Sequence, residues 1–271
     1  MELPQLSDVE FGHVQKLMQN VSGIIMANHK KQLVAGRLLK RLKALGFESF
    51  SEYVALLEDP RQQDERRLAV DLLTTNETFF FREEAHFHFL KSIITDWDRR
   101  PLSIWSAACS SGEEVYSISM LLSDLLPGYS NWSLVGSDLC RHALDSARQG
   151  IYPMSRAQGI PAEFLKRYCL KGVGELEGLL QVKQELREKV SFYCINLNTN
   201  LPADLPVFDI IFLRNILIYF DADGKKSIVE RILSRLKPGG FLFIGHSESL
   251  YGLGLPLTSC GSAVYYHEPA A

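Results

Sequence analysis

The sequence has no strong excess of one charge and no long apolar run. Its 271 residues carry 29 lysines and arginines against 32 aspartates and glutamates, a formal net charge of -3. This balance argues against general nucleic-acid binding. No run of about 20 apolar residues occurs, so we expect no direct membrane insertion. The opening Met1-Glu2-Leu3-Pro4 lacks the basic and apolar regions of a secretory signal.

Cysteine is scarce and scattered. The five cysteines form no Cys-x-x-Cys pair and no cluster with metal-ligand spacing. Reduced thiols and a cytoplasmic location are the simplest interpretation. His86, His88 and His246 likewise have no second ligand at metal spacing, so we predict structural roles for them and no metal site.

What is present is an ordinary globular composition, with 46% hydrophobic residues, and a change of pattern near residue 100. Before that point the sequence shows helical periodicity and no convincing strand. Ser7 and Glu10 form a capping-box pattern at the start of the first helical segment. Residues 1–75 are therefore predicted to form a small all-α domain. The expected helices are 7–27, 28–45, 49–57 and 60–73.

From residue 101 onward, short apolar runs alternate with helical segments, which predicts an α/β fold with a mainly parallel, doubly wound sheet. The strand candidates are Leu102–Ala107, Trp132–Ser137, Val190–Ile195, Phe208–Leu213, Phe241–Gly245 and Ala263–Tyr266. The helix candidates are 115–126, 141–149 and 225–236, the last closed by Lys237-Pro238-Gly239-Gly240. The alternation breaks at about 153–190, around Gly172, Gly174 and Gly178, which predicts an inserted small β-subdomain.

An acidic loop, Ser110-Ser111-Gly112-Glu113-Glu114, follows the first predicted strand. In a doubly wound sheet the ligand lies beyond the carboxyl ends of the strands, where the strand order reverses. The Gly-x-Gly-x-x-Gly fingerprint is missing, and the two carboxylates would repel a pyrophosphate. They suit a cationic ligand such as an ammonium or a sulfonium. The alternative is that they only favour a helix N-terminus through its dipole, and Glu114 in particular is open to that interpretation.

Other polar residues follow the neighbouring strands. Asp138 ends the second strand, where an acid commonly accepts hydrogen bonds from ribose hydroxyls; alternatively it caps helix 141–149. Arg214 and Asn215 end a buried strand and are expected to face the cleft, with Tyr219 one helical turn further along. A tyrosine there can orient a nucleophile and stack on a sulfonium, although a buried tyrosine with a satisfied hydroxyl is an equal alternative.

Two segments before residue 101 also carry polar chemistry. Residues 76–100 are predicted to be a linker helix whose residues Asn76, Thr78 and Arg82 line the pocket; the alternative is a capping box of Thr74 with Glu77 that only opens the helix. Residues 30–43 hold six basic residues and no acid. Arg37, Lys40 and Arg41 share one face, which indicates either an acidic partner or a solvated surface.

Several longer motifs, in the right order along nearly the whole chain, resemble the chemotaxis-receptor glutamate methyltransferases, the CheR family. They are Asn76-x-Thr78-x-Phe80-Phe81-Arg82-Glu83, Trp105-Ser106-Ala107-Ala108-Cys109-Ser110-Ser111-Gly112-Glu113-Glu114, Ser137-Asp138, Arg214-Asn215-x-x-x-Tyr219-Phe220-Asp221, Leu236-Lys237-Pro238-x-Gly240 and Gly245-His246-Ser247-Glu248.

The resemblance implies a helical N-terminal domain and a class I methyltransferase-type catalytic domain over residues 101–271. It implies methylation of glutamate carboxylates of bacterial chemoreceptors, with S-adenosyl-L-methionine as cofactor and S-adenosyl-L-homocysteine as product. It also implies that Tyr219 lies near the transferred methyl group and that Arg82 contacts the cofactor or the incoming glutamate. The cofactor residues implied are Asn76, Thr78, Arg82, Glu113, Asp138, Asn196, Leu197, Arg214 and Asn215.

The resemblance also implies partners. The basic face of Arg37, Lys40 and Arg41 would recognise acidic helices of chemoreceptor cytoplasmic domains. The β-subdomain would dock on receptors, and the glycine-rich run from Gly172 to Gly178 is similar to that of members that bind a receptor's C-terminal peptide.

Three other functions share some of these features. A nicotinamide-dependent oxidoreductase would have the same sheet and ribose-binding acid, but the glycine fingerprint is absent. A non-catalytic adaptor would not need Tyr219 and Arg82. A nucleic-acid methyltransferase would carry Asn-Pro-Pro-aromatic after the fourth strand, where this chain has Arg214-Asn215-Ile216-Leu217.

Overall fold

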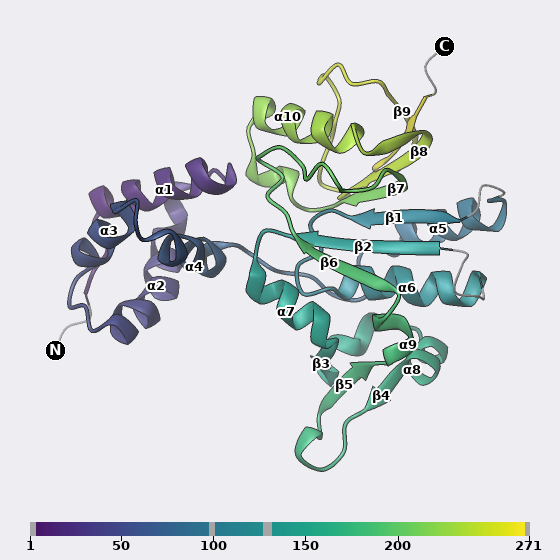
Figure 1. Cartoon of the computed structure of the whole chain (residues 1–271), viewed down its shortest axis with the longest axis horizontal. Coiled ribbons are helices and arrows are strands. Elements are labelled where there is room, and N and C mark those ends of the chain that lie inside the picture. The colour runs from purple at the N-terminus through teal and green to yellow at the C-terminus, as the bar shows by residue number, and fades with distance from the viewer. Residues whose placement is uncertain (1–3, 98–100, 127–131, 269–271) are drawn as a thin grey trace. The chain divides into compact units, whose positions relative to one another are not determined.

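The computed structural model describes residues 4–97, 101–126 and 132–268. The chain divides into two compact units (Figure 1). The helical unit contains Met1–Thr75 and Tyr219–Gly224, and the α/β unit contains Asn76–Ile218 and Lys225–Ala271. No helix in the part of the chain that the structure describes is both long and apolar enough to cross a lipid bilayer.

Between residues 4 and 75 the helical unit is built from four α-helices and one 3₁₀ turn: α1 (Asp8–Ser22), η1 (Asn28–Lys30), α2 (Lys31–Leu45), α3 (Phe50–Glu58) and α4 (Gln63–Leu73). Helix α1 begins with the predicted capping box, since the Ser7 hydroxyl accepts from the Glu10 N–H while the Glu10 carboxylate accepts from the Ser7 N–H at 2.7 Å. It ends earlier than predicted, because Gly23 adopts a left-handed φ of 75° that closes the helix. Val14, Leu38 and Tyr53 are almost fully buried in the core of the helical unit.

A seven-stranded mixed sheet forms the centre of the α/β unit, in the order β6-β2-β1-β7-β8-β10-β9. The first five strands in this order run parallel, β10 is antiparallel to β8, and β9 is antiparallel to β10. The strands are β1 (Leu102–Ser106), β2 (Trp132–Asp138), β6 (Val190–Cys194), β7 (Phe208–Leu213), β8 (Leu236–Ile244), β9 (Leu257–Gly261) and β10 (Val264–His267). The predicted fold class, a mainly parallel doubly wound sheet preceded by a small all-α domain, is confirmed.

The larger helices of this unit are α5 (Glu84–Thr95), α6 (Glu113–Leu125), α7 (Arg141–Gln149) and α10 (Ala222–Leu233), the last of which begins in the helical unit. Helices α5 and α6 bury an apolar core with β1 and β7, in which Leu90, Ile118 and Phe212 are fully buried. Helix α7 packs on β2 and β6.

Two predicted elements are corrected. The linker helix predicted for 76–100 is shorter: α5 begins at Glu84, because Phe81 and Glu83 take left-handed φ values of 55° and 59° that a helix cannot contain. The end of that prediction, 98–100, lies outside the described residues. The helix predicted for 225–236 ends at Leu233, and Pro238 lies within strand β8. The pairing of β8 with β7 shifts register near this proline, as expected where a residue without an N–H interrupts a ladder.

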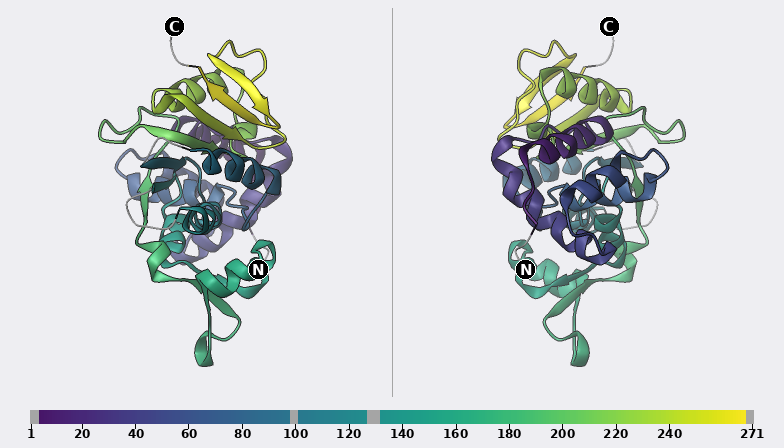
Figure 2. Two further views of the ribbon diagram at one scale, coloured as in Figure 1. Left: turned by 90° about the vertical axis from the view of Figure 1, so that its right-hand side faces the viewer. Right: turned by 90° about the vertical axis from the view of Figure 1, so that its left-hand side faces the viewer.

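The predicted inserted β-subdomain is present as a three-stranded antiparallel sheet, in the order β3-β5-β4. Its elements are β3 (Ile151–Pro153), η2 (Met154–Gly159), α8 (Ala162–Tyr168), β4 (Cys169–Lys171), η3 (Gly174–Leu176), β5 (Leu179–Val182) and α9 (Gln184–Arg187). The β4–β5 hairpin extends away from the larger sheet in every view (Figures 1 and 2). Gly172 is required where the loop of this hairpin begins, since an added Cβ would lie 1.9 Å from the Leu176 carbonyl oxygen.

Candidate active site

The strand order reverses next to β1, which has β2 on one side and β7 on the other. Strands β2 and β6 extend the sheet in one direction, and β7 and β8 extend it in the other. The carboxyl ends of these parallel strands lie at the same edge of the sheet. In open α/β sheets this is the edge where ligands bind.

The loop after β1 brings three predicted positions together. The Ser110 N–H donates to Asp138 Oδ2 at 2.8 Å, and the Ser110 hydroxyl donates to the Asn76 carbonyl oxygen at 3.2 Å. Ser110 itself has a φ of 49°. The loop ends at Gly112, whose φ of 92° disfavours any side chain and whose added Cβ would lie 2.8 Å from Ala147 Cβ. The loop conformation therefore depends on a glycine at this position.

Asp138 is fixed by backbone donors from two loops. Its Oδ1 accepts from the Cys140 N–H at 2.9 Å, while its Oδ2 accepts from Ser110. The N-cap of α7 is Cys140, so the alternative prediction that Asp138 caps that helix is wrong. Asp138 instead joins the turn after β2 to the loop after β1.

Glu113 is the first residue of α6 and is fully buried. Its Oε2 accepts from the Ser111 hydroxyl at 2.7 Å, and its Oε1 pairs with the Arg156 guanidinium of η2. A ligand ammonium at this carboxylate would therefore meet a position that already holds a cation of the chain.

The sequence left open that Glu114 only stabilises the N-terminus of α6 through the helix dipole, but the structure gives it specific partners. Its two oxygens accept from the Ser106 hydroxyl and from Arg214 Nη1, both at 2.7 Å. Arg214 also lies 3.1 Å from Glu83 Oε2 and donates to the Arg82 carbonyl oxygen. With only 2% of its side chain exposed, Arg214 joins β7, α6 and the 76–83 segment.

The 76–83 segment holds its polar side chains outside any helix. Thr78 and Arg82 are half-buried, and Arg82 Nη1 donates to the Glu77 carbonyl oxygen at 2.9 Å. The Arg82 guanidinium also lies 5.6 Å from the centre of the Phe79 ring. The capping box of Thr74 with Glu77 does not form, because Thr74 ends α4 and its hydroxyl donates to a carbonyl within that helix.

Asn215 takes a left-handed φ of 56° directly after Arg214. Its side-chain amide donates to Glu83 Oε1 at 3.1 Å, and its backbone N–H donates to Glu248 Oε2 at 2.9 Å. Gly245 permits this approach, since an added Cβ would lie 2.5 Å from Asn215 Nδ2. The turn after β7 is thus built against the turn after β8.

Glu248 is the residue that the sequence did not single out. Its carboxylate accepts from the N–H groups of Gly245 at 2.6 Å, Asn215 at 2.9 Å and Ile218 at 3.3 Å. Burial raises its pKa above the usual value, although these backbone donors act in the opposite direction. The available signal was its place in the motif Gly245-His246-Ser247-Glu248, to which no role was attached.

Asn196 and Leu197 follow β6 at the same edge of the sheet. Asn196 Oδ1 accepts from the Asn198 N–H at 2.9 Å, and the carbonyl oxygen of buried Leu197 accepts from Arg231 Nε at 2.9 Å. These bonds fix the loop that carries both predicted cofactor residues.

Tyr219 belongs to the helical unit, although Ile218 before it belongs to the α/β unit. Its carbonyl oxygen accepts from the Ile25 N–H at 2.9 Å, and the Lys30 ammonium lies 5.2 Å from its ring centre. Its placement beside a transferred methyl group stays a prediction.

Most of the predicted basic face on α2 is already engaged. Arg37 donates to the carbonyl oxygens of Leu73 at 2.9 Å and Thr74 at 2.8 Å. Arg41 Nε donates to Glu65 Oε1 at 2.8 Å. Lys40 is exposed. Two of the three predicted contact residues therefore stabilise the helical unit itself.

The fold also gathers two of the histidines that lacked a partner in sequence. One ligand atom each from Glu83, His86 and His246 lies within 4.8 Å of the others. Burial, followed by the charge of Arg214, lowers the pKa of His86 to about 4. The Arg214 guanidinium that pairs with Glu83 would repel a metal cation at this cluster, so its contacts are better explained as structural.

These features define a methyltransferase-type doubly wound domain with a helical domain before it. Residues 76–265 match the family described as "CheR methyltransferase, SAM binding domain", and residues 9–74 match "CheR methyltransferase, all-alpha domain". The chain belongs to the CheR methyltransferase family, and its cofactor is S-adenosylmethionine.

Curated relatives agree with this assignment. The chain is 40% identical to the chemotaxis protein methyltransferase of Salmonella typhimurium, over 96% of this chain and 90% of that protein. It is 41% identical to chemotaxis protein methyltransferase 2 of Pseudomonas aeruginosa, over 94% and 92% of the two chains. Among solved structures, the N-methyltransferase NodS from Bradyrhizobium japonicum with S-adenosyl-L-homocysteine is 15% identical, covers 60% of this chain and 63% of its own, and has a TM-score of 0.34.

Proposed function

We propose that this protein methylates glutamate side chains of bacterial chemoreceptors, giving glutamate methyl esters. The supporting observation is the junction of Asn76, Ser110 and Asp138 at the carboxyl ends of β1 and β2, beside the buried carboxylate of Glu113. The names of the relatives, which are chemotaxis protein methyltransferases, supply the biological setting.

The donor set at this edge fits the cofactor. A buried carboxylate at Glu113 suits the methionyl ammonium, and Asp138 suits the ribose hydroxyls. When bound, S-adenosylmethionine supplies an electrophilic methyl group on its sulfonium. Asn76, Thr78, Asn196, Leu197 and Asn215 are the other residues that we assign to its binding, and Arg82 is assigned to its carboxylate or to the incoming glutamate.

Arg214 has a different part in this proposal from the one that the family resemblance implies. Its guanidinium is enclosed by Glu114, Glu83 and the Arg82 carbonyl. We therefore assign it to positioning the 76–83 segment and the start of α6. Its effect on the cofactor would then pass through those two segments.

The chemistry needs no general base. A glutamate carboxylate with an ordinary pKa of about 4.3 is ionised at neutral pH. Its oxygen forms the new bond to the methyl carbon while the bond from carbon to sulfur breaks, so no proton is transferred. The chain has to hold the carboxylate about 3–3.5 Å from that carbon and in line with the leaving sulfur. We assign Tyr219 to this positioning.

Receptor recognition would use surfaces on both units. On α2, exposed Lys40 and Lys43 remain available to acidic receptor helices, whereas Arg37 and Arg41 serve mainly to hold α4 and the residues after it. On the β-subdomain, strand β4 has a free edge and the hairpin exposes Val173 and Leu176. A free edge with apolar neighbours can accept an extended peptide by strand addition, which supports binding of a receptor's C-terminal segment there.

Incubation with methyl-labelled S-adenosylmethionine and receptor-bearing membranes tests the proposal. We expect label on the receptor that mild alkali releases as methanol, as an ester requires. Tyr219→Phe and Arg82→Ala should both slow transfer. Alkali-stable label would overturn the glutamate assignment, and wild-type rates in both variants would overturn the residue roles. Receptors with and without their C-terminal tails test the β-subdomain separately.

A further inference from the structure

Arg66 differs from the other arginines of the helical unit. Arg37 donates to backbone carbonyls, and Arg41, Arg61 and Arg67 each pair with a carboxylate. The Arg66 side chain makes no hydrogen bond or ion pair with any residue that the structure describes, and its Nε is buried without a partner. A buried donor without an acceptor costs about 1–3 kcal/mol, so such a group calls for an explanation.

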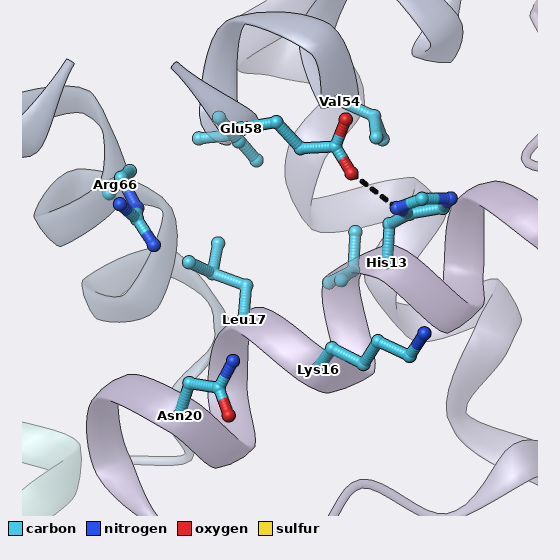
Figure 3. Close-up of a pocket in the computed structure, with 9 residues that line it drawn as sticks. His13, Lys16, Leu17, Asn20, Val54, Glu58 and Arg66 are labelled. Atoms are coloured by element: carbon cyan, nitrogen blue, oxygen red, sulfur yellow. Dashed lines mark ion pairs between the residues drawn. The ribbon is translucent and has the colours of Figure 1, made fainter. Parts of the chain in front are cut away.

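Arg66 lines a pocket of about 230 Å³ between α1, α3 and α4 (Figure 3). The pocket walls include buried Leu17 and Val54, which give it an apolar surface. Figure 3 shows the Arg66 guanidinium on one side and the pair of His13 with Glu58, at 2.5 Å, on the other. All of these residues belong to the helical unit, so the pocket needs no residue from the other unit.

The polar lining of the pocket favours negative charge. Lys16 and Asn20 lie one helical turn apart on α1 and are exposed, and their side chains have no hydrogen-bond partner among the described residues. Lys16 and Arg66 therefore contribute two cations without counter-ions. The one carboxylate in the lining, Glu58, is already paired with His13. An anion would thus find a guanidinium, an ammonium and an amide as donors, against the single carboxylate of Glu58, which lies against His13 Nδ1.

We propose that this pocket binds a small organic anion that joins one carboxylate to a short apolar chain. Arg66 receives the carboxylate, since a guanidinium can donate two parallel hydrogen bonds to it. Leu17 and Val54 contact the apolar chain. A volume of about 230 Å³ is smaller than the 300–1,000 Å³ of typical drug-sized sites, so the ligand is small. The site is separate from the residues assigned to methyl transfer.

Chemical-shift titration of the full chain with hexanoate tests this proposal. We expect saturable binding, with shifts confined to α1, α3 and α4. Arg66→Gln should weaken binding about tenfold or more, because a charge-assisted hydrogen bond is lost. The matched control is Arg67→Gln on the same helix, whose arginine pairs with Asp64 at the surface and should leave binding unchanged. Lys16→Gln, at an exposed position, should weaken binding several-fold without affecting the fold.

Three further probes separate the contributions. Hexylammonium and hexanol carry the apolar chain without the negative charge, and inorganic phosphate carries the charge without the chain. We expect all three to bind at least about tenfold more weakly than hexanoate. Equal binding of hexanol or hexylammonium would overturn the anion assignment, and equal binding of phosphate would overturn the requirement for an apolar chain. Absence of hexanoate binding, or an equal loss in Arg66→Gln and Arg67→Gln, would overturn the site itself.

Discussion

Replacing Glu248 tests whether the turns after β7 and β8 are held for catalysis. Glu248→Gln keeps the size of the side chain but leaves one oxygen where two accept backbone N–H groups. The amide nitrogen would then face either the N–H groups of Gly245 and Asn215 or that of Ile218. An amide N–H group that faces backbone N–H groups must move away from them. We expect Asn215, whose backbone is in the left-handed region, to be displaced first.

The expected size of the effect follows from these bonds. Hydrogen bonds to a charged acceptor contribute about 1.5–3 kcal/mol each, and a buried N–H left without an acceptor costs about 1–3 kcal/mol. Loss of one or two therefore destabilises the turn by about 2–4 kcal/mol. Because a shift of about 1 Å in a positioning group can cost on the order of 100-fold in rate, we expect kcat/KM to fall about 10- to 100-fold. The rise in KM for S-adenosylmethionine should account for much of that fall.

Asp209→Asn is the matched control. Asp209 is also a buried carboxylate of the sheet, but it lies at the amino ends of the strands, where its Oδ2 accepts from the Ser103 N–H at 2.9 Å and from Lys237 Nζ at 2.9 Å. This control should lower the melting temperature while leaving the KM for cofactor unchanged. Equal KM values in the two variants at matched folded fractions would refute the positioning role of Glu248.

The pH profile gives an independent check on Glu248. Its pKa is raised, so the carboxylate takes up a proton earlier than an ordinary glutamate as the pH falls. A protonated carboxyl accepts fewer hydrogen bonds and presents a donor to the turn. Wild-type kcat/KM should therefore begin to decrease at a higher pH than protonation of the substrate glutamate alone would cause, and Glu248→Gln should retain only the substrate's part of that decrease. An unchanged acidic limb in the variant would assign the limb to another group.

Three further predictions concern the same unit. Arg214→Gln leaves Glu83 and Glu114 without their shared cation and should lower the free energy of unfolding by about 3–5 kcal/mol in urea denaturation; a loss below about 1 kcal/mol would contradict the pairing. His86, whose pKa falls to about 4, stays neutral in the fold while the unfolded chain takes up a proton below about pH 6.5. The wild type should therefore lose about 3 kcal/mol of stability between those pH values, and His86→Asn should remove that part of the slope. Gly112→Ala forces a side chain into a left-handed position and should weaken cofactor binding in calorimetry by about tenfold, whereas unchanged affinity would show that the loop tolerates a Cβ.

The sequence predicted the elements that depend on local pattern. Buried parallel strands such as β7 are continuous apolar runs bounded by turn residues, and α1 carries its own start signal in Ser7 and Glu10. Strand β9 was missed because Leu257–Gly261 contains mostly polar and exposed residues, with no alternation to detect. Strand β8 was predicted too short, because Pro238 and Gly239 are typical of a helix end even though their pairing with β7 is non-local.

The predicted site residues could be found from strand ends, but their pairings could not. Asp138, Arg214 and Asn215 stand at the carboxyl ends of predicted strands, which follows from topology. The partner of Arg214 at Glu114 is 100 positions away, and that of Asn215 at Glu248 is 33 positions away. Such contacts depend on side-chain direction and on the left-handed turn at Asn215, which no local pattern specifies.

The two carboxylates of the loop after β1 already pair with arginines of the chain, so a cofactor must bind where these ion pairs exist. The sequence alone indicated an acidic loop that attracts a cation. In the structure, Glu113 is paired with Arg156 and Glu114 with Arg214, so neither carboxylate is an unbalanced charge. An incoming ammonium at Glu113 must share that carboxylate with Arg156 or displace it. Arg156 is 43% exposed and Arg214 only 2%, so Arg156 can turn into solvent at little cost while Arg214 cannot. The ion pair of Arg156 with Glu113 can therefore open when a ligand binds. The ion pair of Arg214 with Glu114 keeps the loop in place during that exchange.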